Sequence, residues 1–485
     1  MMALPEYRRS GAPLLEADRL AIHAGNALLL QPVSFSVRAG EALTLLGESG
    51  AGKSLLAQAV MGTLPDGLRA SGRLACAGRA SDAGDAAARR PLWGRCVALL
   101  PQEPWFALDP LMRVGSQLAE SWRLVGGKPR DESWRAALAA LRQMGVEHAA
   151  PALPGTLSGG MAQRVAFAMV RAGGAPVLIV DEPTKGLDHR WRDAVVEHLR
   201  EALAHGCAVV TITHDIAVAR ALGGQAMVLQ EGKVVEQGST ATVLSAPSHP
   251  YTRELVAADP AAWAGTVAAS PPAAPEGGTA GRAIIGASGL AKRFGEQILF
   301  TGLTMQIRSG EHVAVTGPSG SGKSTLGNIL LGLVRADEGH VHRADAVPRH
   351  RFQKLYQDPG AAFAPRRRIG DGLQDLIRLH RLDGARLGPM MEQLGLAPAL
   401  LRRLPGAVSG GELQRFALLR ALLLQPVFLF ADEPTSRLDP VTQKRTIELI
   451  VQACDETGAA LMLVTHDPDI ASHIAGHDPR RMLAF

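Results

Sequence analysis

The stretch GESGAGKS (Gly47–Ser54) decides the fold of this chain, and it returns as GPSGSGKS at Gly317–Ser324. Each copy follows a short apolar run, at 42–46 and 312–316, and precedes a sequence with helical periodicity. Both copies match G-x-x-x-x-G-K-S, in which the backbone N–H groups of a glycine-rich loop surround phosphate oxygens. The lysine supplies a cation to the phosphates, and the serine supplies a hydroxyl to Mg²⁺. The sequence therefore predicts two phosphate-binding loops, each between a strand and a helix.

Four further segments recur in the same order after each loop. Equivalent residues lie 251 to 255 positions apart in these segments and 270 apart at the loop lysines, Lys53 and Lys323. The first copy therefore carries an insertion, mostly Ala75–Arg90, whose composition predicts a surface loop. The recurring pairs are LPQEP (Leu100–Pro104) and LYQDP (Leu355–Pro359), LSGGMAQR (Leu157–Arg164) and VSGGELQR (Val408–Arg415), VLIVDEPTKGLD (Val177–Asp188) and FLFADEPTSRLD (Phe428–Asp439), and TITHD (Thr211–Asp215) and LVTHD (Leu463–Asp467).

Duplication of one domain explains the length of 485 residues. We expect a first domain at 14–255, a linker at 256–282 and a second domain at 283–485. The linker is rich in Ala, Pro and Gly and shows no periodic apolar face that a core could bury.

Composition excludes several classes of protein. The formal charge of +5 is spread along the chain, and the longest basic run is Arg366–Arg368, so nucleic-acid binding is not expected. No apolar run approaches the roughly 18–20 residues of a membrane helix, and the first twenty residues lack a signal-peptide core. The four cysteines have neither metal-ligand nor disulfide spacing, which indicates reduced thiols in an intracellular protein.

Carboxylates and histidines stand where chemistry is expected in an α/β sheet. The runs at 177–180 and 427–431 read as buried parallel strands that end in Asp-Glu, and ligands bind at such carboxyl ends. Asp181 and Asp432 could hold the Mg²⁺ shell, while Glu182 and Glu433 could orient or deprotonate an attacking water. A solvated acidic strand end would not explain the Pro-Thr that follows both times. His214 and His466 end two further apolar runs, 32 and 33 residues after the glutamates, which favours a γ-phosphate contact over a structural role.

Taken together, these motifs resemble the ATP-binding cassette (ABC) family over nearly the whole chain apart from the linker and the first dozen residues. LSGGMAQR and VSGGELQR are the most discriminating, since other P-loop NTPases lack them. The resemblance implies an α/β fold with two tandem P-loop NTPase domains, each with a mostly parallel sheet and a helical subdomain. It also implies ATP and Mg²⁺ as ligands, and head-to-tail pairing that places each ATP between one glycine-rich loop and the other domain's SGG segment.

The resemblance carries over to individual residues. Phe294 fits the family's adenine-stacking aromatic in the second copy, whereas the first copy has Ala24 beside His23. Before the Leu-Asp turn, Lys185 and Arg437 replace the small residues that are common in the family. Asp188 and Asp439 would lie in turns at the interface. The implied catalytic residues are Glu182, Glu433, His214, His466, Gln102 and Gln357, and the implied Mg²⁺ residues are Ser54, Gln102, Asp181, Ser324, Gln357 and Asp432. The implied nucleotide-binding residues are Gly47, Ser49, Gly50, Gly52, Lys53, Ser54, Leu55, Gly317, Ser319, Gly320, Gly322, Lys323, Ser324, Thr325, Phe294, Ser158, Gly159, Gly160, Ser409, Gly410 and Gly411.

Within the family, SHPYTREL (Ser248–Leu255) and the stretches after both glutamines resemble the ATPases of dipeptide, oligopeptide and nickel importers. The absence of cysteine after this segment favours nickel or a metallophore. Expected partners are two membrane permease subunits and an extracytoplasmic solute-binding protein, which places the chain peripherally at the cytoplasmic face of the inner membrane. The alternatives are a fused sugar or vitamin/cobalt importer ATPase and a tandem-cassette ATPase of ribosomes. An intact second loop argues against the sugar class, and an Ala/Pro/Gly-rich linker argues against the ribosomal class.

Overall fold

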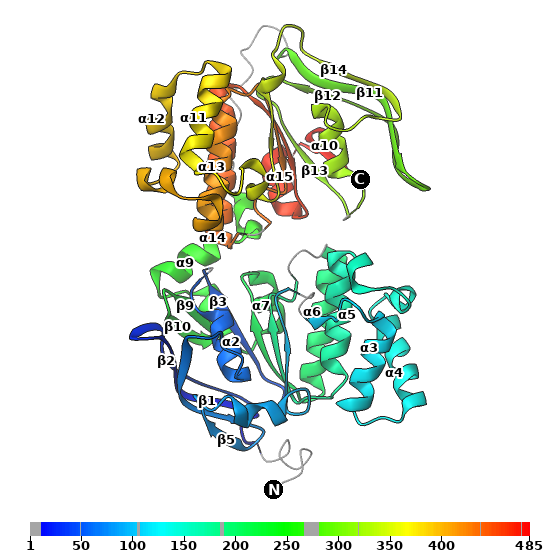
Figure 1. Cartoon of the computed structure of the whole chain (residues 1–485), viewed down its shortest axis with the longest axis vertical. Coiled ribbons are helices and arrows are strands. Elements are labelled where there is room, and N and C mark those ends of the chain that lie inside the picture. The colour runs from blue at the N-terminus through cyan, green and yellow to red at the C-terminus, as the bar shows by residue number, and fades with distance from the viewer. Residues whose placement is uncertain are drawn as a thin grey trace. The chain divides into compact units, whose positions relative to one another are not determined.

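A computed structural model describes residues 11–48, 50–103, 107–184, 189–265, 281–318, 320–436, 438–476 and 478–485. The chain divides into two compact units, Met1–Val256 and Ala257–Phe485. Each unit combines a mainly parallel sheet, a smaller antiparallel sheet and a group of helices (Figure 1), which confirms the expected α/β fold. Among the described residues, no helix is long and apolar enough to cross a lipid bilayer.

The first unit is built on a six-stranded sheet in the order β10-β9-β3-β8-β7-β6. Its neighbouring strands are parallel except for β9 and β10. Strands β3, β7 and β8 are buried along their whole length, as expected for apolar runs covered on both faces. The strands are β3 (Ala42–Gly47), β6 (Val97–Leu100), β7 (Val177–Asp181), β8 (Ala208–Ile212), β9 (Gln225–Gln230) and β10 (Lys233–Ser239).

Two apolar clusters cover the two faces of this sheet. Side chains alternate between them along β7, where Val177 and Ile179 join one cluster and Leu178 and Val180 join the other. The first cluster includes α2, and the second includes residues of α3 to α7. The helices are α2 (Lys53–Met61), α3 (Val114–Leu124), α4 (Arg130–Gln143), α5 (Gly159–Arg171), α6 (His189–Ala204), α7 (Ile216–Leu222), α8 (Thr240–Ser245) and α9 (Pro250–Ala257).

A four-stranded antiparallel sheet, β2-β1-β4-β5, completes the first unit. The expectation of a surface loop over Ala75–Arg90 is wrong, because β5 pairs with β4 and a short 3₁₀ helix follows at Ala87–Leu92. Arg89 is 4% exposed, and its guanidinium donates to the carbonyl oxygens of Asp82 and Ala83 at 3.0 and 2.7 Å. These backbone contacts order a stretch whose composition alone indicates no structure. The strands are β1 (Leu15–Ala24), β2 (Ala27–Val37), β4 (Leu68–Cys76) and β5 (Arg79–Asp82).

The second unit repeats this plan. Its sheet has the order β15-β16-β17-β13-β18 with all pairs parallel, and β18 pairs with β13 as β9 pairs with β3. The strands are β11 (Ala283–Phe294), β12 (Gln297–Arg308), β13 (His312–Thr316), β14 (Glu338–Arg343), β15 (Phe352–Leu355), β16 (Phe428–Asp432), β17 (Ala460–Val464) and β18 (Met482–Ala484). The helices are α10 (Lys323–Leu331), α11 (Ile369–His380), α12 (Leu387–Gln393), α13 (Gly410–Leu423), α14 (Pro440–Thr457) and α15 (Pro468–Ala475).

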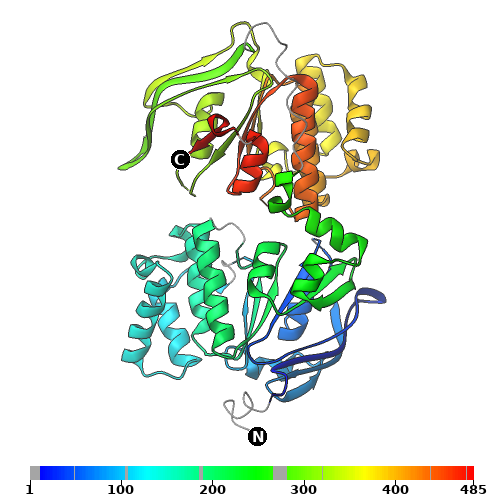
Figure 2. The same ribbon diagram turned by 180° about the vertical axis from the view of Figure 1, so that it is seen from behind.

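A helical subdomain is present in each unit, as the family resemblance implies. Helices α11 and α12 lie on the side of the second unit away from the antiparallel strands β11, β12 and β14 (Figures 1 and 2). In the first unit, α3 and α4 lie in the same way, away from β1 and β2 (Figures 1 and 2).

The beginning of the expected linker has a fixed place in the second unit, which corrects the sequence interpretation. Residues Pro260–Gly265 form a 3₁₀ helix, and Trp263 is only 3% exposed within the apolar cluster that contains α13, α14 and α15. Its ring meets His473 of α15 edge to face, with centroids 5.4 Å apart. The composition concealed this contact because a single aromatic residue, rather than a periodic face, provides the buried surface.

We predict that Trp263→Ala destabilises the second unit. Truncation of a buried tryptophan removes apolar burial and leaves a cavity, with an expected loss of about 3 kcal/mol in the free energy of unfolding. Denaturant unfolding followed by far-UV circular dichroism measures this loss. Trp134→Ala is the control, because Trp134 is 44% exposed and its truncation should cost much less. Equal effects of the two substitutions would contradict the assignment of Trp263 to the core.

Candidate functional site

The two glycine-rich loops follow β3 and β13 and lead into α2 and α10, as predicted. Gly50 and Gly52 have φ values of +86° and +93°, and their counterparts Gly320 and Gly322 have +80° and +105°. These angles lie in the region that glycine adopts without steric cost. At Gly47 the chain passes so close to β9 that a Cβ atom would lie 2.0 Å from the carbonyl oxygen of Leu229. The loop shape therefore requires glycine for steric reasons. Ser49 and Ser319 lie outside the described residues.

Both loop lysines are buried and held against their own loops. Lys53 Nζ donates to the carbonyl oxygens of Gly47 and Glu48 at 2.8 and 2.7 Å. Lys323 Nζ makes the same contacts with Gly317 and Pro318, also at 2.8 and 2.7 Å. Lys53 is 8% exposed and Lys323 is 4% exposed. Each loop thus keeps a positive charge beside the backbone amides of its helix N-terminus, an arrangement that favours an anion.

The two glutamates lie immediately after β7 and β16, each beside a histidine. His214 Nδ1 is 2.9 Å from Glu182 Oε1, and His466 Nε2 is 2.5 Å from Glu433 Oε1. Glu182 and Glu433 have φ values of +51° and +46°, in the left-handed region that costs a non-glycine residue about 1–2 kcal/mol. The same strained conformation in both units turns the two carboxylates toward the histidines. The sequence gives no signal for this backbone conformation.

The two glutamines differ in their contacts. Gln357 Nε2 donates to Glu433 Oε2 at 2.9 Å, so the second unit brings its predicted glutamine, glutamate and histidine together. Gln102 follows β6 at the equivalent position and is partly exposed. Among the described residues, Gln102 makes no corresponding hydrogen bond to Glu182.

Ser324 and Asp432 meet at the carboxyl ends of the central strands. Ser324 Oγ donates to Asp432 Oδ1 at 2.7 Å, which places two oxygen ligands of the kind that Mg²⁺ prefers side by side. Asp181 and Asp432 are 7% and 6% exposed, and Ser54 is the second residue of α2 as Ser324 is of α10. A lysine that the sequence analysis missed, Lys354, also reaches Asp432: its Nζ lies 2.9 Å from Oδ2.

The SGG segments form the N-termini of α5 and α13, with Ser158 and Ser409 as N-caps. Ser409 and Glu412 form a capping box, and the hydrogen bond from the Ser409 backbone N–H lowers the pKa of Glu412. The first unit has Met161 at the equivalent position. A Cβ atom on Gly159 or Gly410 would meet nothing within 4 Å, so packing inside each unit does not require glycine there. Gly160 and Gly411 follow as the second residues of these helices, whose backbone amides carry a partial positive charge.

The predicted difference at the adenine position is visible in the structure. Phe294 ends β11, is 55% exposed and lies beneath Lys292, whose Nζ is 5.1 Å from the ring centroid. In the first unit, Ala24 ends β1, and His23 Nε2 lies 3.2 Å from Ser71 Oγ. The second unit therefore offers an exposed aromatic face where the first offers a small side chain. Of the turns expected at an interface, the one with Asp439 is described: Asp439 caps α14 by accepting from the Thr442 N–H at 3.1 Å. Lys185, Asp188 and Arg437 lie outside the described residues.

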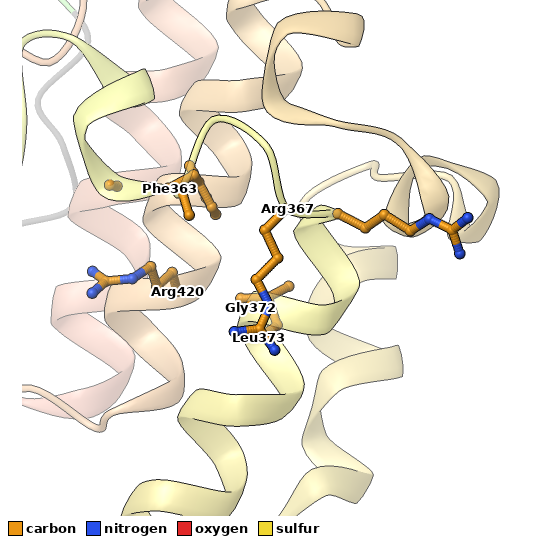
Figure 3. Close-up of a pocket in the computed structure, with 8 residues that line it drawn as sticks. Phe363, Arg367, Gly372, Leu373 and Arg420 are labelled. Carbon is orange, nitrogen blue, oxygen red and sulfur yellow. The ribbon is translucent and has the colours of Figure 1, made fainter.

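A small pocket lies next to the Gln357 segment in the helical subdomain of the second unit. Phe363 from the loop before α11, Leu373 of α11 and Arg420 of α13 line it (Figure 3). Arg367 and Arg368 also belong to its lining, and Arg367 forms an ion pair with Asp375 of α11. The basic run that appeared unremarkable in the sequence thus lies beside the glutamine segment.

The segment SHPYTREL forms the start of α9 and is held by Glu236 of β10, a contact the sequence did not indicate. Glu236 Oε1 accepts from the Ser248 N–H at 2.8 Å, and Oε2 accepts from the His249 N–H at 3.0 Å. Burial alone would raise the pKa of Glu236, but hydrogen bonds from Ser248, Thr252 and His249 outweigh it and lower the pKa to about 2. Tyr251 and Leu255 are buried. The segment therefore has a structural role as a helix cap.

Comparisons with known proteins agree with this geometry. The family model "ABC transporter" matches the chain twice, at residues 30–185 and 300–436. The peptidoglycan transport ATP-binding protein YejF of Agrobacterium fabrum is 32% identical over 491 residues, which cover 96% of this chain and 90% of that protein. The glutathione import ATP-binding protein GsiA of Salmonella typhi is 33% identical over 502 residues, which cover 91% of this chain and 80% of the relative.

Among solved structures, one titled "RNase-L Inhibitor" aligns with 96% of this chain and 90% of its own, with a TM-score of 0.64. At 18% sequence identity, this likeness extends to the fold alone.

We predict that Glu236→Gln destabilises the first unit by about 1 kcal/mol at neutral pH, because the charged acceptor at the start of α9 is lost. The folded pKa of Glu236, about 2, lies below the ordinary value of 4.5. The stabilisation is therefore fully present above pH 4.5 and is lost as the pH falls toward 2. Thermal unfolding of the wild-type chain and of Glu236→Gln, measured between pH 7 and pH 3.5, should show a difference in melting temperature that becomes smaller below pH 4.5. A difference independent of pH would contradict this role. Glu132→Gln, at an exposed site on α4, is the control.

Proposed function

Because this chain belongs to the ABC transporter family, we propose that it is the ATP-hydrolysing subunit of an importer, with one hydrolytic site for each cassette. The domain limits expected from the sequence, 14–255 and 283–485, stay part of this proposal, with 257–265 now assigned to the second unit. The observation that carries the proposal is the repeated set of loop lysine, strand-end aspartate, left-handed glutamate and histidine.

The contacts support a division of roles within each site. The loop amides with Lys53 or Lys323 bind the phosphates, and Ser54 with Asp181 or Ser324 with Asp432 would hold Mg²⁺. The 2.7 Å contact between Ser324 and Asp432 supports this fit, because it gathers hard oxygen donors at the loop. When bound, Mg²⁺ supplies charge neutralisation to the phosphates. Glu182 and Glu433 orient or deprotonate water, His214 and His466 contact the γ-phosphate, and Gln102 and Gln357 report the state of the site to the transporter.

We propose that the two cassettes pair head to tail. In that arrangement Ser409, Gly410 and Gly411 would complete the first site, and Ser158, Gly159 and Gly160 would complete the second. The open space around Gly159 and Gly410 supports this idea, since glycine there serves an approaching phosphate rather than packing within the unit. A helix N-terminus that meets a triphosphate loses its partner after hydrolysis, so closure and opening would follow the nucleotide.

The relatives support a peptide-class solute. They are named for peptidoglycan and glutathione transport, and neither name mentions nickel, so we propose a peptide or peptide-like solute in place of the metal suggested by the cysteine-free linker. The partners would be two permease subunits and an extracytoplasmic solute-binding protein, with the chain peripheral to the cytoplasmic face of the membrane. The pocket lined by Phe363, Leu373 and Arg368 is suited to a permease segment with an apolar anchor and a carboxylate or carbonyl group (Figure 3).

We predict that Glu182→Gln and Glu433→Gln each reduce ATP hydrolysis and that the double variant loses it by at least about a hundredfold, because the general base is removed. Phosphate release by the purified chain measures this loss. Nucleotide binding should persist, since glutamine keeps the size and position of the side chain. Full activity in the double variant would overturn the catalytic assignment. Glu132→Gln, far from either loop in sequence and exposed on α4, should hydrolyse ATP normally.

We predict that deletion of this chain abolishes uptake of a labelled dipeptide or of glutathione and that the wild-type chain restores it. The double glutamate variant should not restore it, because transport requires hydrolysis. Uptake of nickel, measured in the same strains, distinguishes the metal class. Restoration of nickel uptake alone would refute the peptide assignment. Co-sedimentation with ribosomes together with unchanged uptake would refute the importer function itself.

A further inference from the structure

A buried lysine distinguishes the second nucleotide site from the first. Lys354 lies on β15, and its side chain is 11% exposed. Its Nζ is 2.9 Å from Asp432 Oδ2 and donates to Asn328 Oδ1 at 3.0 Å. It also lies over the rings of Tyr356 and Phe430, at 5.1 and 5.3 Å from the centroids. A buried charge with this many partners has a defined position.

At the matching position, the first unit has Leu99 instead of a lysine. The register is the same in both sheets, since Lys354 pairs with Phe430 on β16 and Leu99 pairs with Ile179 on β7. Leu99 packs against the apolar cluster of the first unit. The residue on the loop helix also differs, because Gln58 of α2 stands where Asn328 stands on α10. The difference is therefore a local replacement of apolar contacts by an ion pair at one of the two sites.

The lysine contacts one of the proposed Mg²⁺ ligands. Asp432 Oδ2 faces Lys354, while Oδ1 accepts the Ser324 hydroxyl, so both oxygens of the carboxylate are already engaged by the protein. A fixed positive charge beside this carboxylate repels a divalent cation and neutralises part of the charge that would attract it. The same charge supports a bound triphosphate when the metal is absent.

We infer that Lys354 is a built-in cation of the second site that competes with Mg²⁺ for Asp432 and makes nucleotide binding there less dependent on the metal than in the first site. This inference rests on the proposed function, because it takes Asp432 and the second glycine-rich loop as the nucleotide site. Lys354 acts through Asp432 and is thus a positioning residue. Two sites with the same sequence motifs would therefore differ in how strongly nucleotide binding depends on Mg²⁺.

The test compares nucleotide affinity with Mg²⁺ and with EDTA, using a fluorescent, non-hydrolysable ATP analogue on the full chain. The second site is isolated with Lys53→Ala, and the first with Lys323→Ala. The measured quantity is the dissociation constant in EDTA divided by that in Mg²⁺. In the Lys53→Ala background, Lys354→Leu should increase this ratio on the order of tenfold, because one positive charge near the divalent cation is removed. Lys354→Arg, which keeps the charge, should leave the ratio near that of the parent. Leu99→Lys in the Lys323→Ala background should decrease it.

The possible failures are distinguishable. An unchanged or smaller ratio in Lys354→Leu, with nucleotide still bound and thermal unfolding unaltered, overturns the competition by Lys354 while the proposed function stands. Loss of all nucleotide binding in the Lys53→Ala background overturns the assignment of the second site, and this inference with it. If Leu99→Lys fails to fold, the comparison of Lys354→Leu with Lys354→Arg still decides the question.

Discussion

The parallel register of the central strands is the constraint on which the rest of each unit depends. Strands β3, β8 and β7 pair side by side, so the loop after β3, the histidine after β8 and the Asp-Glu pair at the end of β7 lie at one edge. The second unit repeats this with β13, β17 and β16. Segments more than a hundred residues apart thereby supply the lysine, the carboxylates and the imidazole of one site. Apolar burial on both faces of the sheet stabilises this register, and the register determines which side chains meet at the carboxyl ends of the strands.

Much of this was predictable from the sequence because each motif has a local physical cause. The glycine-rich loops and the strands that end in Asp-Glu lie where the residues predicted them. Contacts that depend on one side chain were not predictable. Trp263 has no periodic neighbours, Glu236 lies twelve residues before the segment it caps, and Lys354 stands in an otherwise ordinary strand. The conformation of Glu182 and Glu433 depends on the strand ends around them and leaves no trace in composition.

The two copies share an architecture but differ at matched positions around the nucleotide sites. The first unit has Met161 where the second has the capping glutamate Glu412. It likewise has Ala24 in place of the exposed Phe294 and Leu99 in place of Lys354. Each difference adds a charged or aromatic group to the second unit where the first has an apolar side chain. The motifs that carry the chemistry are retained in both, so these differences affect how nucleotide and metal are held more than which reaction is possible.

The left-handed backbone conformation of the two glutamates lowers the stability of the chain at residues that are proposed to act in hydrolysis. Glycine at 182 and 433 would adopt these backbone angles without the steric cost of roughly 1–2 kcal/mol that glutamate bears at each position, which is partly offset by the greater freedom of glycine in the unfolded chain. A chain with these glycines would have no carboxylate beside either histidine. Design that optimises backbone stability alone would therefore favour removal of the carboxylates that are proposed to act in hydrolysis. Two of the non-glycine residues held in left-handed backbone are thus the glutamates proposed to act on water.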